Sequence, residues 1–388
     1  MKKFLILILF IPTTIELMAQ NYSDSLTTKL TNHFKNSDLP GFSVAIVNED
    51  KVLYQKGFGF ANKDTKKAFD NTTVQALGSV SKTVVGLALV KAIGDGKLTM
   101  DTEINDILPF TVINPFFKDS PILIRHLANH TSSILDTKHY GKSYVLDDAF
   151  ALSDNVHQDF LGFIKSHDPI ELEEFLANIL SEEGKWYRKK NFLKAKPGTA
   201  KEYANLNAAL AAYIIEIATD TPFEEYTQTQ IFSPLGMPNT AWNTNEKMKD
   251  ELATPYFPAG AEVPRYKLIT YPDGGLHSNT NDLSLYLQEI IKAYAGNSTY
   301  LTSEYAKILL PGDDDTDRTF WGMGEESRSI GHSGSDPGVQ TDLQFNADSK
   351  IGRIILTNVN AEDNDILSEQ YREIHRILAE YESKLIAR

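Results

Sequence analysis

The chain has 388 residues, 41% of them hydrophobic, so it can bury a large core in one two-lobed domain or in two domains. Its net charge of −14 at pH 7 is spread along the sequence, which makes nucleic acid and anionic membranes poor partners. It contains no cysteine, which excludes disulfides and a lipid-modified cysteine.

The N-terminus has the pattern of a secretory signal. Lys2 and Lys3 precede an apolar run over residues 4–11, and Ala19 suits the last position before a cleavage site. The apolar run is too short to span a bilayer comfortably. We therefore expect residues 1–19 to be a signal peptide, with a retained anchor as the alternative, and the mature protein to be exported, either periplasmic or secreted.

Strands are predicted near both ends of the chain. After a short helix over residues 23–36, residues 42–62 have the pattern of two strands joined by a polar turn at 48–50. Residues 328–360 alternate apolar and polar side chains between turn signals, which predicts three more antiparallel strands. We expect the strands from the two ends to pair in one sheet.

The predicted fold class is therefore α+β, with a mostly antiparallel sheet, packed helices and an inserted, mainly helical lobe. We expect one domain over residues 20–388. Its sheet lobe covers approximately 20–75 and 255–388, and its helical lobe approximately 76–254. The last segment predicts a helix packed on the sheet through one apolar stripe: Ile366, Tyr371, Ile374, Ile377, Leu378, Tyr381 and Leu385.

The tetrapeptide Ser79-Val80-Ser81-Lys82 opens an apolar, helix-like run. Positions i and i+3 share a helix face, so Lys82 can lie beside Ser79. A serine hydroxyl is a weak nucleophile until a neighbouring group takes its proton, and a desolvated lysine amine can do this. Alone, this pattern also arises by chance in many chains.

A second candidate pair is Tyr203 and Asn205, which precede or begin a predicted helix after Pro197 and Gly198. Residues two apart do not share a helix face, so both can reach one cleft only from the loop that leads into the helix. Tyr203 then offers a proton-relaying phenol and Asn205 an amide for a substrate carbonyl. The alternatives are a half-buried core tyrosine and a helix cap.

A third candidate is His332-Ser333-Gly334, on the first of the three C-terminal strands. Gly334 allows a substrate to approach the backbone, and the Ser335 N–H can complete an oxyanion hole with that of Ser79. The alternative is a solvent-exposed strand histidine.

These three motifs occur in the order and approximate separation found in the serine β-lactamase and penicillin-binding-protein superfamily. The chain resembles its branch of class C β-lactamases, D-alanyl-D-alanine carboxypeptidases and esterases, whose motifs are S-x-x-K, Y-x-N and K-T-G or H-x-G. The resemblance covers nearly the whole mature chain and implies a β-lactamase/transpeptidase-like fold. Four further stretches are similar to that branch: residues 124–134, 231–240, 271–283 and 321–324.

The resemblance also implies roles for the motif residues. Ser79 would be the acylated nucleophile, Lys82 and Tyr203 would handle protons, and Asn205 would bind substrate. The strand positions implied to bind substrate are His332, Ser333 and Gly334.

Two departures from the family pattern affect substrate recognition. The lysine of K-T-G is a permanent cation that can bind a carboxylate, whereas His332 has an ordinary pKa near 6.5 and is mostly neutral at pH 7. The usual H-T-S-G appears here as residues 130–133, with Ser133 replacing glycine, so the following turn can differ in shape.

Metal sites are weakly indicated. His126 and His130 have the spacing of a zinc pair on a helix, but Leu127 replaces the glutamate of H-E-x-x-H. The acidic run over residues 313–317 lacks the glycine and glutamate of a calcium loop, which favours a solvated loop. We expect no metal and no cofactor.

Residues 331–335 nearly match the G-x-S-x-G elbow of α/β-hydrolases. Ser335 replaces the last glycine, and another strand, not a helix, follows. This alternative is disfavoured.

The sequence therefore predicts an exported serine hydrolase that forms an acyl-enzyme through Ser79. Its substrate would be a small molecule or peptide, such as a fragment of the cell wall, with a D-amino-acid or small acyl group cleaved at a peptide, amide or ester bond. One alternative is a class C-like β-lactamase, and another is a non-catalytic wall sensor or binding module. We expect no membrane span beyond the signal, and the sequence leaves the oligomeric state open.

Overall fold

The computed structural model describes residues 14–386 except 245, 313–318, 325–326 and 363. A seven-stranded sheet joins the two ends of the chain in the order β3-β2-β1-β12-β11-β10-β9, and every pairing in it is antiparallel. The strands are β1 Gly41–Val47, β2 Val52–Asn62, β3 Lys67–Ala68, β9 Gly322–Met323, β10 Ser329–Asp336, β11 Val339–Asn346 and β12 Gly352–Thr357. The predicted α+β fold with strands from both ends is confirmed.

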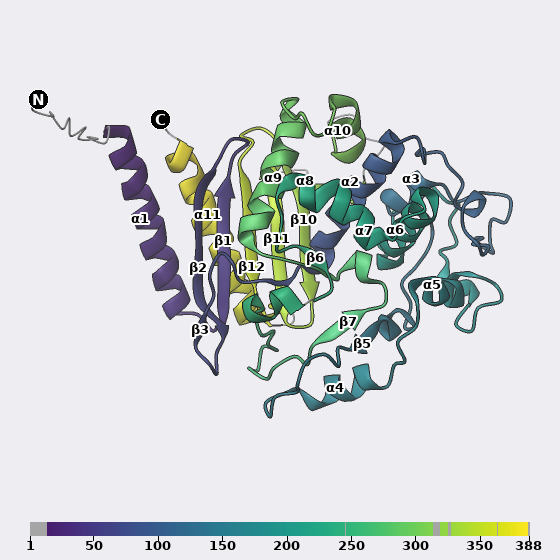
Figure 1. Cartoon of the computed structure of the whole chain (residues 1–388), viewed down its shortest axis with the longest axis horizontal. Helices are drawn as coiled ribbons and strands as arrows, with labels where there is room; N and C mark the ends of the chain where they lie inside the picture. The colour runs from purple at the N-terminus through teal and green to yellow at the C-terminus, as the bar shows by residue number, and fades with distance from the viewer. Residues whose placement is uncertain (1–13, 245, 313–318, 325–326, 363, 387–388) are drawn as a thin grey trace, which may run out of the picture.

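Helices cover both faces of this sheet (Figure 1). On one face lie α1 (Thr14–Lys35) and α11 (Asp365–Ile386), and on the other lies α9 (Thr280–Ala295). Alternate residues of a strand point to opposite faces. Phe42 of β1 accordingly packs with the α1 and α11 side chains, whereas Ala45 belongs to the core cluster that includes α9.

The apolar stripe of α11 differs from the predicted one at its first position. Ile366 is 63% exposed, and Leu367 is buried in its place. Successive helical residues are about 100° apart, so Ile366 lies well off the face that carries Tyr371, whereas Leu367 lies near it. The rest of the predicted stripe packs against the sheet, with Leu385 partly buried.

At the N-terminal end, α1 begins at Thr14 and extends through the short helix predicted over residues 23–36. The apolar run at residues 4–11 lies outside the described residues. Among the helices that the structure describes, none is both long and apolar enough to cross a bilayer.

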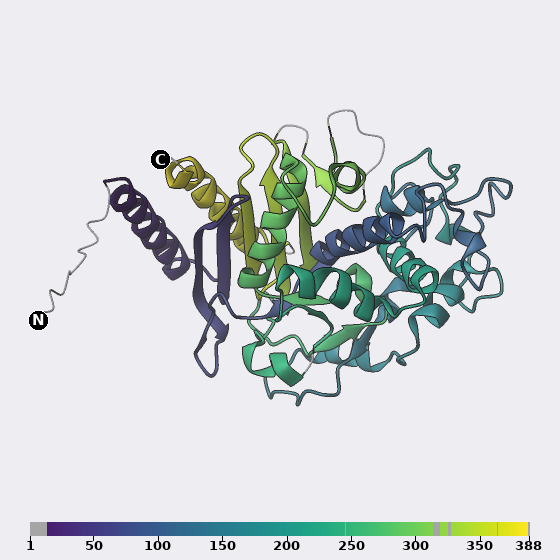
Figure 2. The same ribbon diagram turned by 45° about the horizontal axis from the view of Figure 1, so that its top comes forward.

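The second lobe is inserted between β3 and β9 and is mainly helical (Figures 1 and 2). Its α-helices are α2 Ser81–Gly94, α3 Ile124–Ala128, α4 Gln158–Lys165, α5 Leu172–Leu180, α6 Asn205–Thr219, α7 Phe223–Thr227, α8 Ser233–Leu235 and α10 Ser303–Leu309. The sequence did not predict its five short strands: β4 Gln75–Ala76, β5 Tyr144–Leu146, β6 Ala241–Trp242, β7 Tyr266–Leu268 and β8 Leu276–Ser278.

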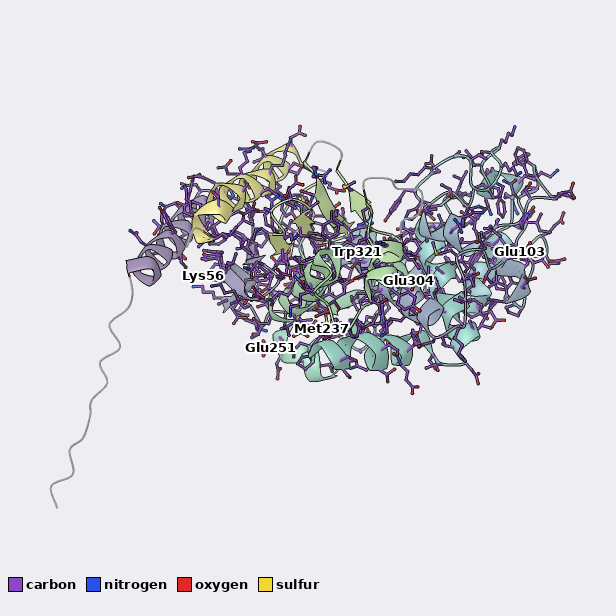
Figure 3. All side chains as sticks on the ribbon, turned by 90° about the horizontal axis from the view of Figure 1, so that it is seen from above. Lys56, Glu103, Met237, Glu251, Glu304 and Trp321 are labelled. Atoms are coloured by element: carbon purple, nitrogen blue, oxygen red, sulfur yellow. The ribbon has the colours of Figure 1, made fainter. Side chains whose placement is uncertain are left out.

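Two helices of this lobe, α2 and α6, contact each other and are buried on nearly all sides. A helix that is apolar all round belongs to the core of a large protein. Seen from above, Lys56 of the sheet and Glu103 of the helical lobe lie on opposite sides of Trp321 (Figure 3). The start of α2 contacts β10, so one end of a rigid core helix meets the sheet.

Candidate active site

Ser79 lies at the junction between the helical lobe and the sheet. It belongs to the single turn η1 (Gly78–Val80), directly before α2. Lys82 is fully buried in the first turn of α2, and its Nζ lies 3.0 Å from Ser79 Oγ. The same Nζ donates a hydrogen bond to the main-chain carbonyl of Asp273. The helical i, i+3 spacing thus places an amine on a serine hydroxyl.

Tyr203 reaches the same hydroxyl from the other side. It directly precedes Ala204, the extended N-cap residue of α6, and its OH donates a hydrogen bond of 2.9 Å to Ser79 Oγ. Lys82 Nζ lies 5.3 Å from the centre of the Tyr203 ring. Tyr203 is 46% exposed, so this edge of the site is open to solvent. A nucleophile, an amine and a phenol therefore converge.

His130 supports Tyr203, a role that the sequence did not reveal. Its ring lies 4.5 Å from the Tyr203 ring, centre to centre, and its Nδ1 accepts a hydrogen bond from the Ala204 N–H. Burial, followed by the charge of Lys82, lowers the pKa of His130 to about 3, so the imidazole is neutral. The neutral His130 ring therefore packs against the Tyr203 ring.

Strand β10 lies directly against the turn that carries Ser79. A Cβ built on Gly334 would lie 2.1 Å from the Leu77 carbonyl oxygen and 3.1 Å from Ser79 N, and one built on Gly78 would lie 3.0 Å from Ser335 N. Gly78 also has φ +53°, which favours glycine. The two glycines let the main-chain N–H groups of Ser79 and Ser335 approach one another, as a two-donor oxyanion hole requires.

Asn205 is the first residue of α6. The hydrogen bonds that the structure describes for it are with Asp136, not with Ser79. Its main-chain N–H donates to Asp136 Oδ2 at 2.7 Å, and the Leu206 N–H donates to Oδ1 at 3.2 Å. An acidic side chain that accepts the first N–H groups of a helix stabilises its N-terminus. Asp136 thus fixes the loop that presents Tyr203, and substrate binding by Asn205 stays a prediction.

His332 lies within β10, half-buried beside the site, with its ring 6.2 Å from that of Tyr203. Burial and the nearby charge of Lys82 lower the pKa of His332 to about 4, well below the ordinary value near 6.5. His332 is therefore neutral at pH 7 and supplies no cation for a substrate carboxylate.

This neutrality gives a test. Because the pKa of His332 is lowered, its protonated form is populated only below about pH 4, so His332→Gln should leave the pH dependence of hydrolysis between pH 5.5 and 8 unchanged. The measurement is kcat/KM for a neutral p-nitrophenyl ester across that range. Loss of a transition near pH 6.5 in the variant would show that His332 titrates in the usual range.

Asp273 is a second feature that the motifs did not reveal. It is 1% exposed and ends the turn η7 (Tyr271–Asp273), from which its carbonyl meets Lys82. Its carboxyl Oδ1 accepts a 2.9 Å hydrogen bond from the Tyr140 hydroxyl. Asp273 thus places a buried carboxyl on the turn whose main-chain carbonyl contacts Lys82.

A cleft of about 300 Å³ opens beside Tyr203, His332 and Ser333. Lys201 also lines it and lies close enough to His130 for its charge to lower the pKa of that imidazole. Among the described residues that line this cleft, Lys201 is the one lysine or arginine, and none is acidic. The cleft therefore has a positively charged side chain in its lining, together with Tyr203.

The structure also bears on the rival sites. His126 lies in α3, but that helix ends at Ala128 and His130 has φ +56°, so the two histidines do not share a helix. Within the described part of the chain, no group of three or more possible metal ligands comes together. Residues 331–335 lie within β10, so they form no nucleophile elbow. The acidic run at 313–317 lies outside the described residues.

Solved structures share this fold. The octameric penicillin-binding protein homologue from Pyrococcus abyssi superposes with a TM-score of 0.68 at 22% identity, covering 92% of this chain and 77% of that one. The β-lactamase/D-alanine carboxypeptidase from Pseudomonas syringae superposes with a TM-score of 0.63 at 17% identity, covering 97% of this chain and 100% of that one. The architecture is thus that of the β-lactamase and penicillin-binding-protein class.

The sequence matches the family described as Beta-lactamase over residues 26–376, and the chain belongs to this family. Protein flp of Staphylococcus aureus (strain N315) is 22% identical over 350 residues, which are 88% of this chain. The chain spans 64% of the length of that relative. The predicted membership of the superfamily is confirmed.

Proposed function

We propose that the protein is an exported serine hydrolase that forms an acyl-enzyme through Ser79. One observation carries the proposal: Ser79 Oγ lies within hydrogen-bond distance of both Lys82 Nζ and Tyr203 OH. A serine flanked by an amine and a phenol is an activated nucleophile. Export is supported by the basic and apolar pattern of residues 1–19.

The chemistry follows from the positions of these groups. Ser79 Oγ attacks a substrate carbonyl carbon while its proton passes to Lys82 or Tyr203, and the carbonyl oxygen becomes an oxyanion facing the N–H groups of Ser79 and Ser335. Tyr203 then protonates the leaving group and assists the water that releases the acyl group. The exposed side of Tyr203 supports this second task, because water can reach it.

The cleft favours a substrate whose leaving group carries a carboxylate. His332 is neutral at pH 7, so Lys201 is the described cleft residue that can attract an anion. We infer a peptide with a free C-terminal D-amino acid as the preferred substrate, with small esters as weaker ones. The Pseudomonas syringae structure named a β-lactamase/D-alanine carboxypeptidase is consistent with this choice.

Lys201→Met tests this inference. We expect kcat/KM for an acyl-D-Ala-D-Ala peptide to fall about tenfold, since a hydrogen bond to a charged group contributes about 1.5 to 3 kcal/mol. Hydrolysis of the same peptide with a C-terminal amide should not change. Lys196→Met, at an exposed position of the same loop outside the cleft lining, is the matched control. Equal losses on both peptides would contradict carboxylate binding by Lys201.

The proposed function itself is tested by acylating probes and a substrate panel. The purified protein is treated with a fluorophosphonate and a fluorescent penicillin, and the adduct is mapped by peptide mass spectrometry. Nitrocefin, acyl-D-Ala-D-Ala, D-amino-acid amides and p-nitrophenyl esters are then compared on one sample. Fastest turnover of nitrocefin would indicate a β-lactamase, and the absence of any Ser79 adduct would indicate a binding module.

A further inference from the structure

The acidic chain contains a strongly basic segment that has no part in the steps above. Residues 185–196 include six lysine and arginine residues and no aspartate or glutamate, although the whole chain has a net charge of −14. Asn191 is fully buried in the middle of this segment, and its Nδ2 donates to the carbonyl oxygens of Ile179 and Trp186 at 2.9 and 3.1 Å. The basic segment therefore has a fixed main-chain path.

A second part of the chain, residues 138–142, packs on this segment through aromatic rings. The His139 ring stacks on the Trp186 indole at 6.2 Å, with an angle of 11° between the ring planes. Lys142 Nζ lies 5.7 Å from the centre of the same indole ring, and Phe175 contacts that ring at 5.5 Å. The contact of a cation with an aromatic face is attractive and helps to hold the two segments together.

Four cations gather around this stack and form a basic patch: Lys138, Lys142, Arg188 and Lys190. Burial, followed by the charges of these four side chains, lowers the pKa of His139. Lys138, Arg188 and Lys190 are exposed, and Lys142 is half-buried. Among the residues that the structure describes, no carboxylate pairs with any of the four, and the nearby Glu174 binds Lys185 instead.

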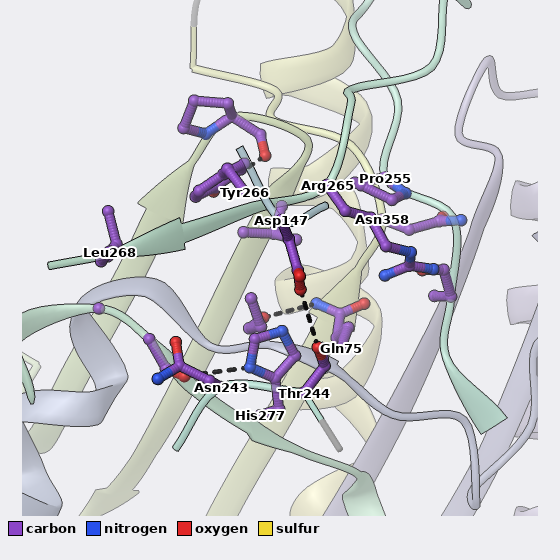
Figure 4. A pocket seen from close by; sticks show the side chains of 16 residues that line it. Gln75, Asp147, Asn243, Thr244, Pro255, Arg265, Tyr266, Leu268, His277 and Asn358 are labelled. Atoms are coloured by element: carbon purple, nitrogen blue, oxygen red, sulfur yellow. Dashed lines mark hydrogen bonds between the residues drawn. The ribbon is translucent and has the colours of Figure 1, made fainter. Parts of the chain in front are cut away.

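Another group of cations in the helical lobe has a carboxylate beside it. Figure 4 shows a small cavity with Asp147 and Arg265 among its walls, and Asp147 Oδ1 also pairs with Lys267 at 3.1 Å. Burial lowers the pKa of Arg265 to about 10, and the charge of Asp147 opposes this shift. Within the described part of the chain the basic patch has no such counter-charge, so its positive potential faces solvent.

The basic patch lies on the loop that supports the candidate active site. Lys138 is two residues from Asp136, whose carboxylate accepts the Asn205 N–H, and two residues from Tyr140, whose hydroxyl donates to Asp273. Successive Cα atoms are about 3.8 Å apart, so the main chain at Lys138 lies within about 8 Å of both anchoring residues. A ligand on the patch would therefore contact the loop that fixes the start of α6.

We propose that the basic patch binds a short acidic peptide segment, with carboxylates of that segment in contact with Lys138, Arg188 and Lys190. Several carboxylates on one chain can pair with several cations at once. The net charge of −14 favours a short ligand, because an extended anionic surface would bring its charge within a Debye length of about 8 to 10 Å of the acidic remainder of the protein. The inference goes beyond the proposed function, since binding requires no hydrolysis.

The test is fluorescence anisotropy of a fluorescein-labelled hexaglutamate peptide with the full-length protein. We expect saturable binding that weakens as sodium chloride is raised, because salt screens exposed charges. The combined variant Lys138→Gln, Arg188→Gln and Lys190→Gln should lower the affinity by about tenfold or more, since each exposed pair contributes little alone and three are removed together. Hexaglutamine, which has the same length and no side-chain charge, should not bind.

The matched control is the combined variant Lys51→Gln, Lys56→Gln and Lys307→Gln. It removes the same total charge at exposed positions outside the basic patch and should keep the wild-type affinity. Ser79→Ala should also bind the peptide as the wild type does. Loss of hydrolysis and loss of peptide binding are therefore separate results, and a failure of the proposed function would leave this inference standing. Melting temperatures identify any variant that fails to fold.

Equal affinity of the wild type and the folded patch variant for hexaglutamate would overturn the proposal. Equal losses in the patch variant and the control variant would also overturn it, because total charge alone would then explain binding. Tighter binding of phosphatidylglycerol vesicles would assign the patch to a membrane surface, and tighter binding of inorganic polyphosphate would assign it to phosphate. Should the combined patch variant fail to fold, unchanged affinity in Lys190→Gln alone, for which we expect a loss of about twofold, would decide against the proposal.

Discussion

Replacing Ser79 with alanine should abolish hydrolysis of p-nitrophenyl esters, leaving less than about 1% of the wild-type rate. Lys82 and Tyr203 both direct polar atoms at Ser79 Oγ, so without that oxygen neither has a nucleophile to act on. Steady-state kinetics and fluorophosphonate labelling of the same preparations provide the measurement.

The control is Ser166→Ala, which removes an exposed serine after α4, far along the chain from the site. It should retain wild-type activity and labelling. Retention of more than about 1% activity by Ser79→Ala, with the expected fold, would show that the nucleophile is another residue.

Gly334→Ala should lower kcat/KM by about 100-fold or more and destabilise the protein. The new methyl group would lie 2.1 Å from the Leu77 carbonyl oxygen and 2.4 Å from Thr341 Oγ1, closer than packed atoms tolerate. Relief of the clash must move β10 away from Ser79, and loss of one oxyanion donor costs about 100- to 1000-fold in rate. Overpacking typically costs about 1 to 3 kcal/mol of stability.

Gly162→Ala is the matched control for this substitution. Gly162 lies within α4, and a Cβ at that position meets no atom within 4 Å. Alanine is the better helix former, so this variant should be as stable as the wild type or slightly more so. Kinetics and thermal unfolding of both variants make the comparison, and wild-type catalysis by Gly334→Ala would refute close contact between β10 and Ser79.

Five strands of the large sheet could be predicted because they are long enough to show a strand pattern, whereas its edge strands β3 and β9 have two residues each and were not predicted. The strands β10 and β11 each span eight residues bounded by turn signals, and β1 and β2 flank a polar turn. In contrast, the short strands β4 to β8 have two or three residues each, too few for any periodicity. The position of Ile366 was wrong because a one-residue shift turns a side chain through about 100°.

The candidate site was predictable only where its residues form local patterns. Ser79 and Lys82 are one turn apart, so sequence spacing alone places them together. No such spacing connects Asp273 to Tyr140, or His130 to Tyr203, because these contacts depend on how distant segments pack. The depressed pKa of His332 likewise follows from burial, which sequence does not give.

The pairing of β1 with β12 constrains when the molecule can become active. Ser79 lies in the first quarter of the chain, whereas β10, which carries the proposed second oxyanion donor, belongs to the last quarter, so a growing polypeptide lacks that proposed donor until synthesis is nearly finished. Such long-range pairing also slows folding, since a large loop must close before the contacts form. If the proposed mechanism holds, we expect the chain to acquire its reactivity only after β10 has been made and has paired in the sheet.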